Sequence, residues 1–232
     1  MYAAINILVY IYLYKQGASY LSQRGGVVEK VYLGMDESNS GNGHSKDSAR
    51  KGPEIYVACI STYLSDFRRN GHTLKGKRNR SIPNWNLFMD NGRDFRYVVV
   101  PAEMFELYKQ MYHNEKHIVR ALIDAFATLI LSCNNIVNPD NLEILIDGKQ
   151  PARIMGGIAD VLTSHGIHPR SLSCEAKADI RLPLVNHADN IASYLRGHYL
   201  ADPSLADDKK LLTPKQCAAV HIDKRVPMIH SF

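Results

Sequence analysis

The chain has 232 residues, of which 45% are hydrophobic and 22% are charged, and a formal net charge of +5. This length and composition predict one globular domain with a proper core and some appended segments. The mild basic bias suits a polyanionic partner without requiring one. None of the four cysteines lies in a CxxC pair, which argues against a zinc site and a disulfide framework and favours a reducing, cytoplasmic interior.

The N-terminal segment MYAAINILVYIYLYK is apolar up to Lys15. It is shorter than the roughly 20 residues that cross a bilayer, and it lacks the positive leading region of a secretory signal. We therefore predict an N-terminal apolar extension over residues 1–28, packed or loosely attached. A membrane anchor and an over-extended start site are the alternatives.

Alternating and β-branched patterns predict the strands, while helical periodicity and glycine or proline boundaries predict the helices. Between the first two strands, 38–52 consists of turn formers and charges, and 66–94 is polar and basic. In chain order the predicted elements are strands 30–36, 54–62 and 95–100, helices 102–113 and 116–133, strand 141–148, helix 151–166, strand 170–176 and helix 184–199.

Three consecutive strands predict an antiparallel meander, and strands separated by helices predict parallel additions through crossovers. The result is an α/β fold with a mixed five-stranded sheet, three strands antiparallel and two parallel, flanked by helices. This is the element order of the ribonuclease H-like fold. We assign residues 29–200 to that domain and residues 201–232, which are weakly periodic, to a C-terminal tail.

Acidic residues fall where the predicted strands end. Asp36 and Glu37 end the first strand, Asp147 ends the fourth in ILIDG, Asp179 follows the fifth in EAKAD, and Asp189 sits early in the last helix. In an open α/β sheet, ligands gather beyond the strand ends. Several carboxylates in one place need positive charge, and Mg²⁺ or Mn²⁺ prefers such oxygen ligands. Two ions about 4 Å apart are typical of phosphodiester cleavage.

At these residues the chain resembles ribonuclease HII, the type 2 ribonuclease H family. The family's Asp-Glu-Ala-Gly-Arg-Gly corresponds to DESNSG, its Val-Asp-Gly to LIDG, and its Lys-Ala-Asp with a proline and an Ala-Ser-rich helix to KADIRLPLVNHADNIASYL. The resemblance covers roughly residues 30–199, and the KAD segment is its most specific part.

The resemblance implies that Asp36, Glu37, Asp147 and Asp179 are catalytic, metal-binding acids, and that the enzyme cuts RNA in RNA–DNA hybrids or at ribonucleotides in DNA. The family reads the ribonucleotide with Gly-Arg-Gly, which is replaced here by Asn39-Ser40-Gly41. The resemblance implies that these three residues and Ser38 contact the nucleic acid. Asp189 is extra; it resembles the Ala-Asp-x-Ile-Ala aspartate of other ribonuclease H-like domains and is a further predicted metal ligand.

The predicted nucleic-acid contacts also include a basic segment, with Trp85 available for base stacking. A solvated loop is the alternative interpretation of this segment, and turn or surface ion-pair roles are the alternatives for the acids. Lys177 either contacts the scissile phosphate or balances the nearby acids. The basic residues are Arg68, Arg69, Lys75, Lys77, Arg78, Arg80 and Lys177.

The sequence thus predicts a nuclease that uses two Mg²⁺ or Mn²⁺ ions to hydrolyse RNA in a hybrid or mixed duplex. Nucleic acid is the predicted partner; no protein partner is evident, and membrane association is not expected. A non-catalytic nucleic-acid-binding domain, or a DNA-directed nuclease of the same fold that depends on Asp189, is the alternative.

Overall fold

The computed structural model describes the sheet and most of its helices. The described residues are 30–38, 54–71, 73–74, 83, 87–88, 92–100, 116–133, 141–201 and 219–221. The N-terminal extension, the helix predicted over 102–113, Trp85 and most of the loop 38–52 lie outside them.

The sheet contains the five predicted strands and one more, in the order β5-β4-β1-β2-β3-β6. β1 pairs antiparallel with β2 and β2 with β3, whereas β4 and β5 continue the sheet parallel to β1. The mixed sheet of the ribonuclease H-like fold is thereby confirmed. The strands are β1 (Val31–Ser38), β2 (Glu54–Ser61), β3 (Arg93–Val100), β4 (Leu142–Asp147), β5 (Ser171–Glu175) and β6 (Ala219–His221).

The sixth strand corrects the predicted number of five. β6 lies in the segment predicted as a tail and pairs in parallel with β3, with Val98 opposite Val220. Three residues, Ala219-Val220-His221, of which only Val220 favours a strand, carry too weak a pattern to be recognised alone, because the pairing partner in β3 supplies most of what stabilises such a short strand.

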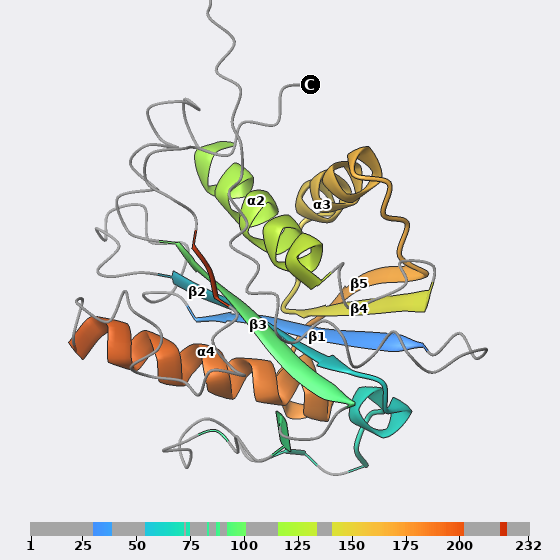
Figure 1. Cartoon of the computed structure of the whole chain (residues 1–232), viewed down its shortest axis with the longest axis vertical. Helices are drawn as coiled ribbons and strands as arrows, with labels where there is room; N and C mark the ends of the chain where they lie inside the picture. The colour runs from blue at the N-terminus through green and yellow to red at the C-terminus, as the bar shows by residue number, and fades with distance from the viewer. Residues whose placement is uncertain are drawn as a thin grey trace, which may run out of the picture.

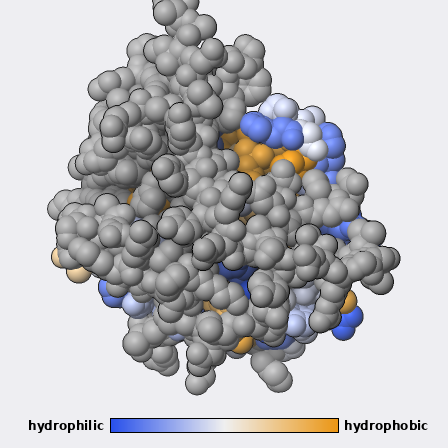
Figure 2. All heavy atoms as spheres, in the orientation of Figure 1, coloured by the Kyte–Doolittle hydropathy of each residue, from blue (hydrophilic) through white to orange (hydrophobic). Residues whose placement is uncertain are grey.

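Helices cover both faces of the sheet (Figure 1). α2 (Lys116–Cys133) and α3 (Ala152–Ser164) lie on one face, and α4 (Pro183–Ala201) lies on the other. Figure 2 shows hydrophobic residues gathered where α3 lies, bordered by hydrophilic ones. Among the described residues, no helix combines the length and the apolar character needed to cross a membrane.

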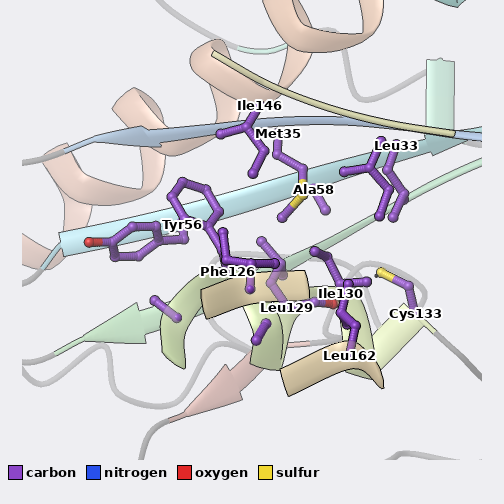
Figure 3. Close-up of a cluster of buried hydrophobic side chains, with 14 of the residues drawn as sticks. Leu33, Met35, Tyr56, Ala58, Phe126, Leu129, Ile130, Cys133, Ile146 and Leu162 are labelled. Carbon is purple, nitrogen blue, oxygen red and sulfur yellow. Dashed lines mark hydrogen bonds between the residues drawn. The ribbon is translucent and has the colours of Figure 1, made fainter. Parts of the chain in front are cut away.

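The larger core lies between the sheet and the α2–α3 layer (Figure 3). Phe126, Leu129 and Ile130 of α2 point toward Leu33 and Met35 of β1, among others. Because side chains alternate along a strand, the even-numbered residues of β1 face the opposite side, toward α4. The apolar core thus fixes which face of β1 carries Asp36.

Short elements cover the end of the sheet that α4 leaves open. η1 (Leu64–Phe67) follows β2, and η6 (Ala178–Ile180) connects β5 to α4. Phe67 stacks on Tyr32 with ring centroids 5.0 Å apart and packs beside Leu145 and Leu182. The chain after η1 therefore crosses the α4 side of β4 and β5 and reaches the loop that carries Asp179.

Candidate metal-binding and nucleic-acid site

Asp36 and Asp147 occupy matching positions on neighbouring parallel strands. β1 and β4 pair with Met35 opposite Ile146, so the next position on each strand is Asp36 and Asp147. Adjacent strands lie about 4.8 Å apart, and residues in register point to the same face. The sheet register therefore brings these two acids together at the strand ends, as the sequence predicted.

Asp189 comes to the same place from α4, and Gly34 allows it. A Cβ on Gly34 would lie 2.7 Å from the backbone C of Leu184 and 2.7 Å from the N of Val185, so the first turn of α4 rests directly on β1. Asp189 is one helical turn beyond Val185, about 5.4 Å, and Asp36 is two strand residues beyond Gly34. The helix thus carries Asp189 along the strand to Asp36.

Asp36 and Asp189 are both buried, with 5% and 0% exposure. Burial, followed by the charges of Glu37, Asp189 and Asp147, raises the pKa of Asp36 well above its usual range. The backbone N–H of Glu37 donates to Asp36 Oδ1 at 2.8 Å and opposes this rise only in part. The site is therefore a set of carboxylates that repel one another in a desolvated position.

Asp179 is held next to Asp147 by backbone contacts. Its N–H donates to Asp147 Oδ1 at 3.2 Å, and Asn186 Nδ2 of α4 donates to its carbonyl at 2.5 Å. Lys177, just before η6, is exposed and has a left-handed φ of 62°. This conformation turns the chain from β5 back toward the end of β4, which is why Asp179 meets Asp147.

The donor set suits a hard divalent cation. All five predicted ligands are carboxylates, which Mg²⁺ and Mn²⁺ prefer, and the mutual repulsion at Asp36 is what a cation would relieve. Within the part of the chain that is described, however, no three His, Cys, Asp or Glu side chains are gathered around a common point as a ready metal site. The residues fit the ion by chemistry and charge.

The predicted nucleic-acid contacts are only partly described. Ser38 is half-buried at the end of β1, and Arg68, Arg69 and Lys177 are exposed. The remaining predicted contacts lie outside the described residues: Asn39, Ser40, Gly41, Lys75, Lys77, Arg78 and Arg80.

The sequence interpretation missed three residues that shape the site. Gly34 brings α4 onto the sheet, Asn186 fixes the backbone at Asp179, and Glu175 lies opposite Asp147 on β5. Only Glu175 had a readable signal, because it shares the alternation of Ser171 and Ser173 away from the apolar face of its strand.

Comparison with known proteins finds similarity in structure and none in sequence. No protein-family model matches the chain, and no curated protein matches it. Among solved structures it is similar to the ribonuclease HII of Archaeoglobus fulgidus in a complex with PCNA, at 17% identity, 84% coverage of both chains and a TM-score of 0.47.

Two further solved structures are similar at the same distant level. Ribonuclease H2 of Pyrococcus horikoshii OT3 shares 15% identity over 76% of this chain and 77% of its own, with a TM-score of 0.44. A point mutant of Bst-RNase HIII shares 14% identity over 87% of this chain and 60% of its own, with a TM-score of 0.47. The fold assignment rests on the strand order and directions of the chain itself, and the site assignment rests on its geometry.

Proposed function

We propose that the chain is a metal-dependent endonuclease that hydrolyses phosphodiester bonds of RNA in RNA–DNA hybrids or ribonucleotide-containing duplexes. The observation that supports this most is the burial of Asp36 at the strand ends among Glu37, Asp147 and Asp189. Stability does not account for a desolvated set of acids that repel one another, because burying carboxylates side by side costs free energy. Strongly perturbed carboxylates at a sheet edge are typical of functional sites.

Asp36, Glu37, Asp147, Asp179 and Asp189 are the residues that would hold Mg²⁺ or Mn²⁺. Such ions lower the pKa of a bound water and stabilise the leaving oxygen of a phosphodiester. The chain itself orients the acids. The sheet register aligns Asp36 with Asp147, and the side chains of Asp147 and Asn186 hydrogen-bond to the backbone of Asp179. Arg68, Arg69 and Lys177 are the exposed cations available for phosphates.

The choice of RNA follows from the motifs DESNSG, LIDG and KAD, which resemble those of the type 2 ribonuclease H family. Replacement of the Gly-Arg-Gly reader by Asn39-Ser40-Gly41 favours a substrate with extended hybrid over a single ribonucleotide junction. The buried Asp189 supports the second candidate, a DNA-directed nuclease of the same fold, because it adds a helix-borne acid to the strand-borne ones.

Cleavage of three labelled duplexes tests the proposal: an RNA–DNA hybrid, a DNA duplex with one ribonucleotide, and plain DNA. Each is incubated with Mg²⁺, with Mn²⁺ and with EDTA. We expect cleavage of the hybrid that depends on the metal. Cleavage of plain DNA at an equal rate identifies the DNA-directed candidate, whereas metal-independent binding with no cleavage of any duplex identifies the non-catalytic one.

A further inference from the structure

A third carboxylate extends the row formed by Asp36 and Asp147. Glu175 is the register partner of Asp147 on β5, so the three acids lie side by side at the ends of three neighbouring parallel strands. Leu172 and Cys174 pack against the α2–α3 core, which places Glu175 on the same face as Asp147. With strands about 4.8 Å apart, Glu175 lies about 5 Å from the Asp147 position and about 10 Å from the Asp36 position.

Glu175 differs from the other two because it is surrounded by arginines. Arg69 Nη2 donates to its Oε2 at 2.6 Å, and Arg181 Nη1 donates to its Oε1 at 3.2 Å. One carboxylate neutralises one of these cations, so the group keeps a net positive charge. The side chains of Arg69 and Arg181 are 66% and 50% exposed, and each bond to Glu175 uses one of the five N–H donors of a guanidinium.

The backbone of Arg181 and that of Asn70, the residue after Arg69, are also joined. The N–H of Asn70 donates to the carbonyl of Arg181 at 2.8 Å, and the N–H of Leu74 donates to the carbonyl of Ile180 at 2.9 Å. Asn70 and Leu74 are therefore fastened to the loop that carries Asp179. Glu175 then holds both guanidinium groups over one spot, and such pre-organisation reduces the entropy lost when a ligand binds.

We propose that Arg69 and Arg181, held by Glu175, form a binding site for a backbone phosphate of the nucleic-acid strand that enters the acid cluster. This inference rests on the proposed function and adds a phosphate contact to it. Planar guanidinium groups bind phosphate oxygens in pairs, which lysine does not do. The site lies a few phosphates from Asp36, since phosphates of one strand follow one another at about 3.4 Å along a duplex. Glu175 is a positioning residue in this arrangement.

Binding measured without cleavage tests the site. The full-length chain is titrated into a fluorescently labelled RNA–DNA hybrid in EDTA at several KCl concentrations, and Kd is read from the anisotropy. Each arginine that contacts a phosphate adds about 0.9 to the slope of log Kd against log salt. We expect R69A and R181A each to lower the slope by about one, and R69A/R181A by about two.

The matched control is R170A. Arg170 is 57% exposed and lies 3.7 Å from Glu143 at the opposite end of β5, so its removal costs one positive charge far from the acid cluster. We expect R170A to keep the wild-type slope. Equal slopes for R69A/R181A and R170A would overturn the inference while leaving the proposed function intact. A wild-type chain that binds no duplex in EDTA would also overturn the phosphate site, and the metal-dependent cleavage assay decides the proposed function separately.

A second variant covers the case in which R69A/R181A unfolds, as judged from its melting curve. R69K/R181K keeps both charges but loses the paired N–H donors. We expect it to keep the wild-type slope while its Kd rises severalfold, because the charge remains and the geometry does not. A Kd equal to that of the wild type would contradict a guanidinium site.

Discussion

Two aspartates on the α4 side of the sheet, the buried Asp36 and the half-buried Asp66, have opposite surroundings. Asp36 lies at the end of β1 among acids, which together with burial raise its pKa. Asp66 lies in η1, beside Ser61, which pairs with Tyr32 near the start of β1. Burial alone would raise the pKa of Asp66, but hydrogen bonds from Arg93 and Ser61 at 2.7 and 2.6 Å outweigh it, and the pKa is lowered.

The difference separates a functional carboxylate from a structural one. Asp66 has its positive and hydrogen-bonding partners within the fold, so its charge is satisfied before any ligand arrives. Asp36 has negative neighbours that the hydrogen bond from the Glu37 N–H offsets only in part, so a cation from outside would stabilise its charge. Stability explains the first arrangement, and the proposed binding of a cation would explain the second.

The largest expected effect is on cleavage, and it applies to one of the two aspartates. D36N removes a predicted ligand, and we expect the metal-dependent rate on the hybrid to fall on the order of a thousandfold, about 4 kcal/mol of transition-state stabilisation. D66N is the control, because its carboxylate contacts Arg93 and Ser61 and not the acid cluster.

The paired rates are measured under single-turnover conditions at a temperature where both variants are folded. We expect D66N to stay within a fewfold of the wild type. A D36N rate close to that of the wild type would contradict the role of Asp36 in cleavage. An equal loss of rate in both variants would show that the cleavage rate follows stability alone.

The next effect comes from moving α4, which carries the acid that faces Asp36. In G34A the new methyl group would lie 2.7 Å from the backbone at Leu184 and Val185, where the neighbour cannot turn aside. We expect a loss of about 1–3 kcal/mol in the free energy of unfolding, measured with urea, as is usual for overpacking.

G156A is the matched control for the same chemical change. Gly156 lies in α3, and a Cβ there meets nothing within 4 Å. Replacing glycine in a helix interior with alanine is expected to raise the stability by about 0.5–1 kcal/mol. If G34A were as stable as G156A, the close approach of α4 to β1 would be wrong, and with it the placement of Asp189.

The stability of D66N tests the structural role of Asp66. The side chains of Asp66 and Arg93 are 14% and 21% exposed, so their pairing is partly screened. We expect D66N to lower the free energy of unfolding by about 1–2 kcal/mol at neutral pH. Because the folded-state pKa of Asp66 is lowered, the stability that its charge contributes is present above the unfolded pKa of about 3.9. That stability is lost as the pH falls through the folded-state pKa. An unchanged urea midpoint at neutral pH would contradict this role.

The sequence was sufficient to predict the sheet and the helices that read as strong patterns. The 18 apolar-rich residues of α2 and the alternation in β1 each match their own elements, and strand order then places Asp36 beside Asp147. These features depend on local periodicity and on the general rule that parallel strands end at one edge.

Contacts between distant segments were beyond that reasoning. Arg69 and Glu175 are separated by 106 positions, and no local pattern joins them. Asp179 was predicted through its side chain, yet its backbone N–H also contacts Asp147, because the left-handed residue Lys177 reverses the chain. β6 was missed because three residues depend on β3 for their pairing.

The smallest expected effect is also the one that separates the two aspartates most sharply, because it has the opposite sign. The folded-state pKa of Asp36 is raised, so the folded state holds its proton more tightly than the unfolded chain does, and stability falls as the pH rises above the unfolded value. With divalent cations removed by EDTA, we expect D36N to raise the free energy of unfolding at neutral pH on the order of 1 kcal/mol. This gain in the free energy of unfolding should vanish in acid, where the wild-type Asp36 carboxyl is protonated. D66N should show a loss in the same free energy at neutral pH, and that loss should also vanish in acid.

Added Mg²⁺ should then stabilise the wild type and not D36N, since a ligand that binds only the folded state raises its stability. A D36N variant less stable than the wild type in EDTA would mean that Asp36 is held by attraction within the fold, and the contrast with Asp66 would no longer identify a site.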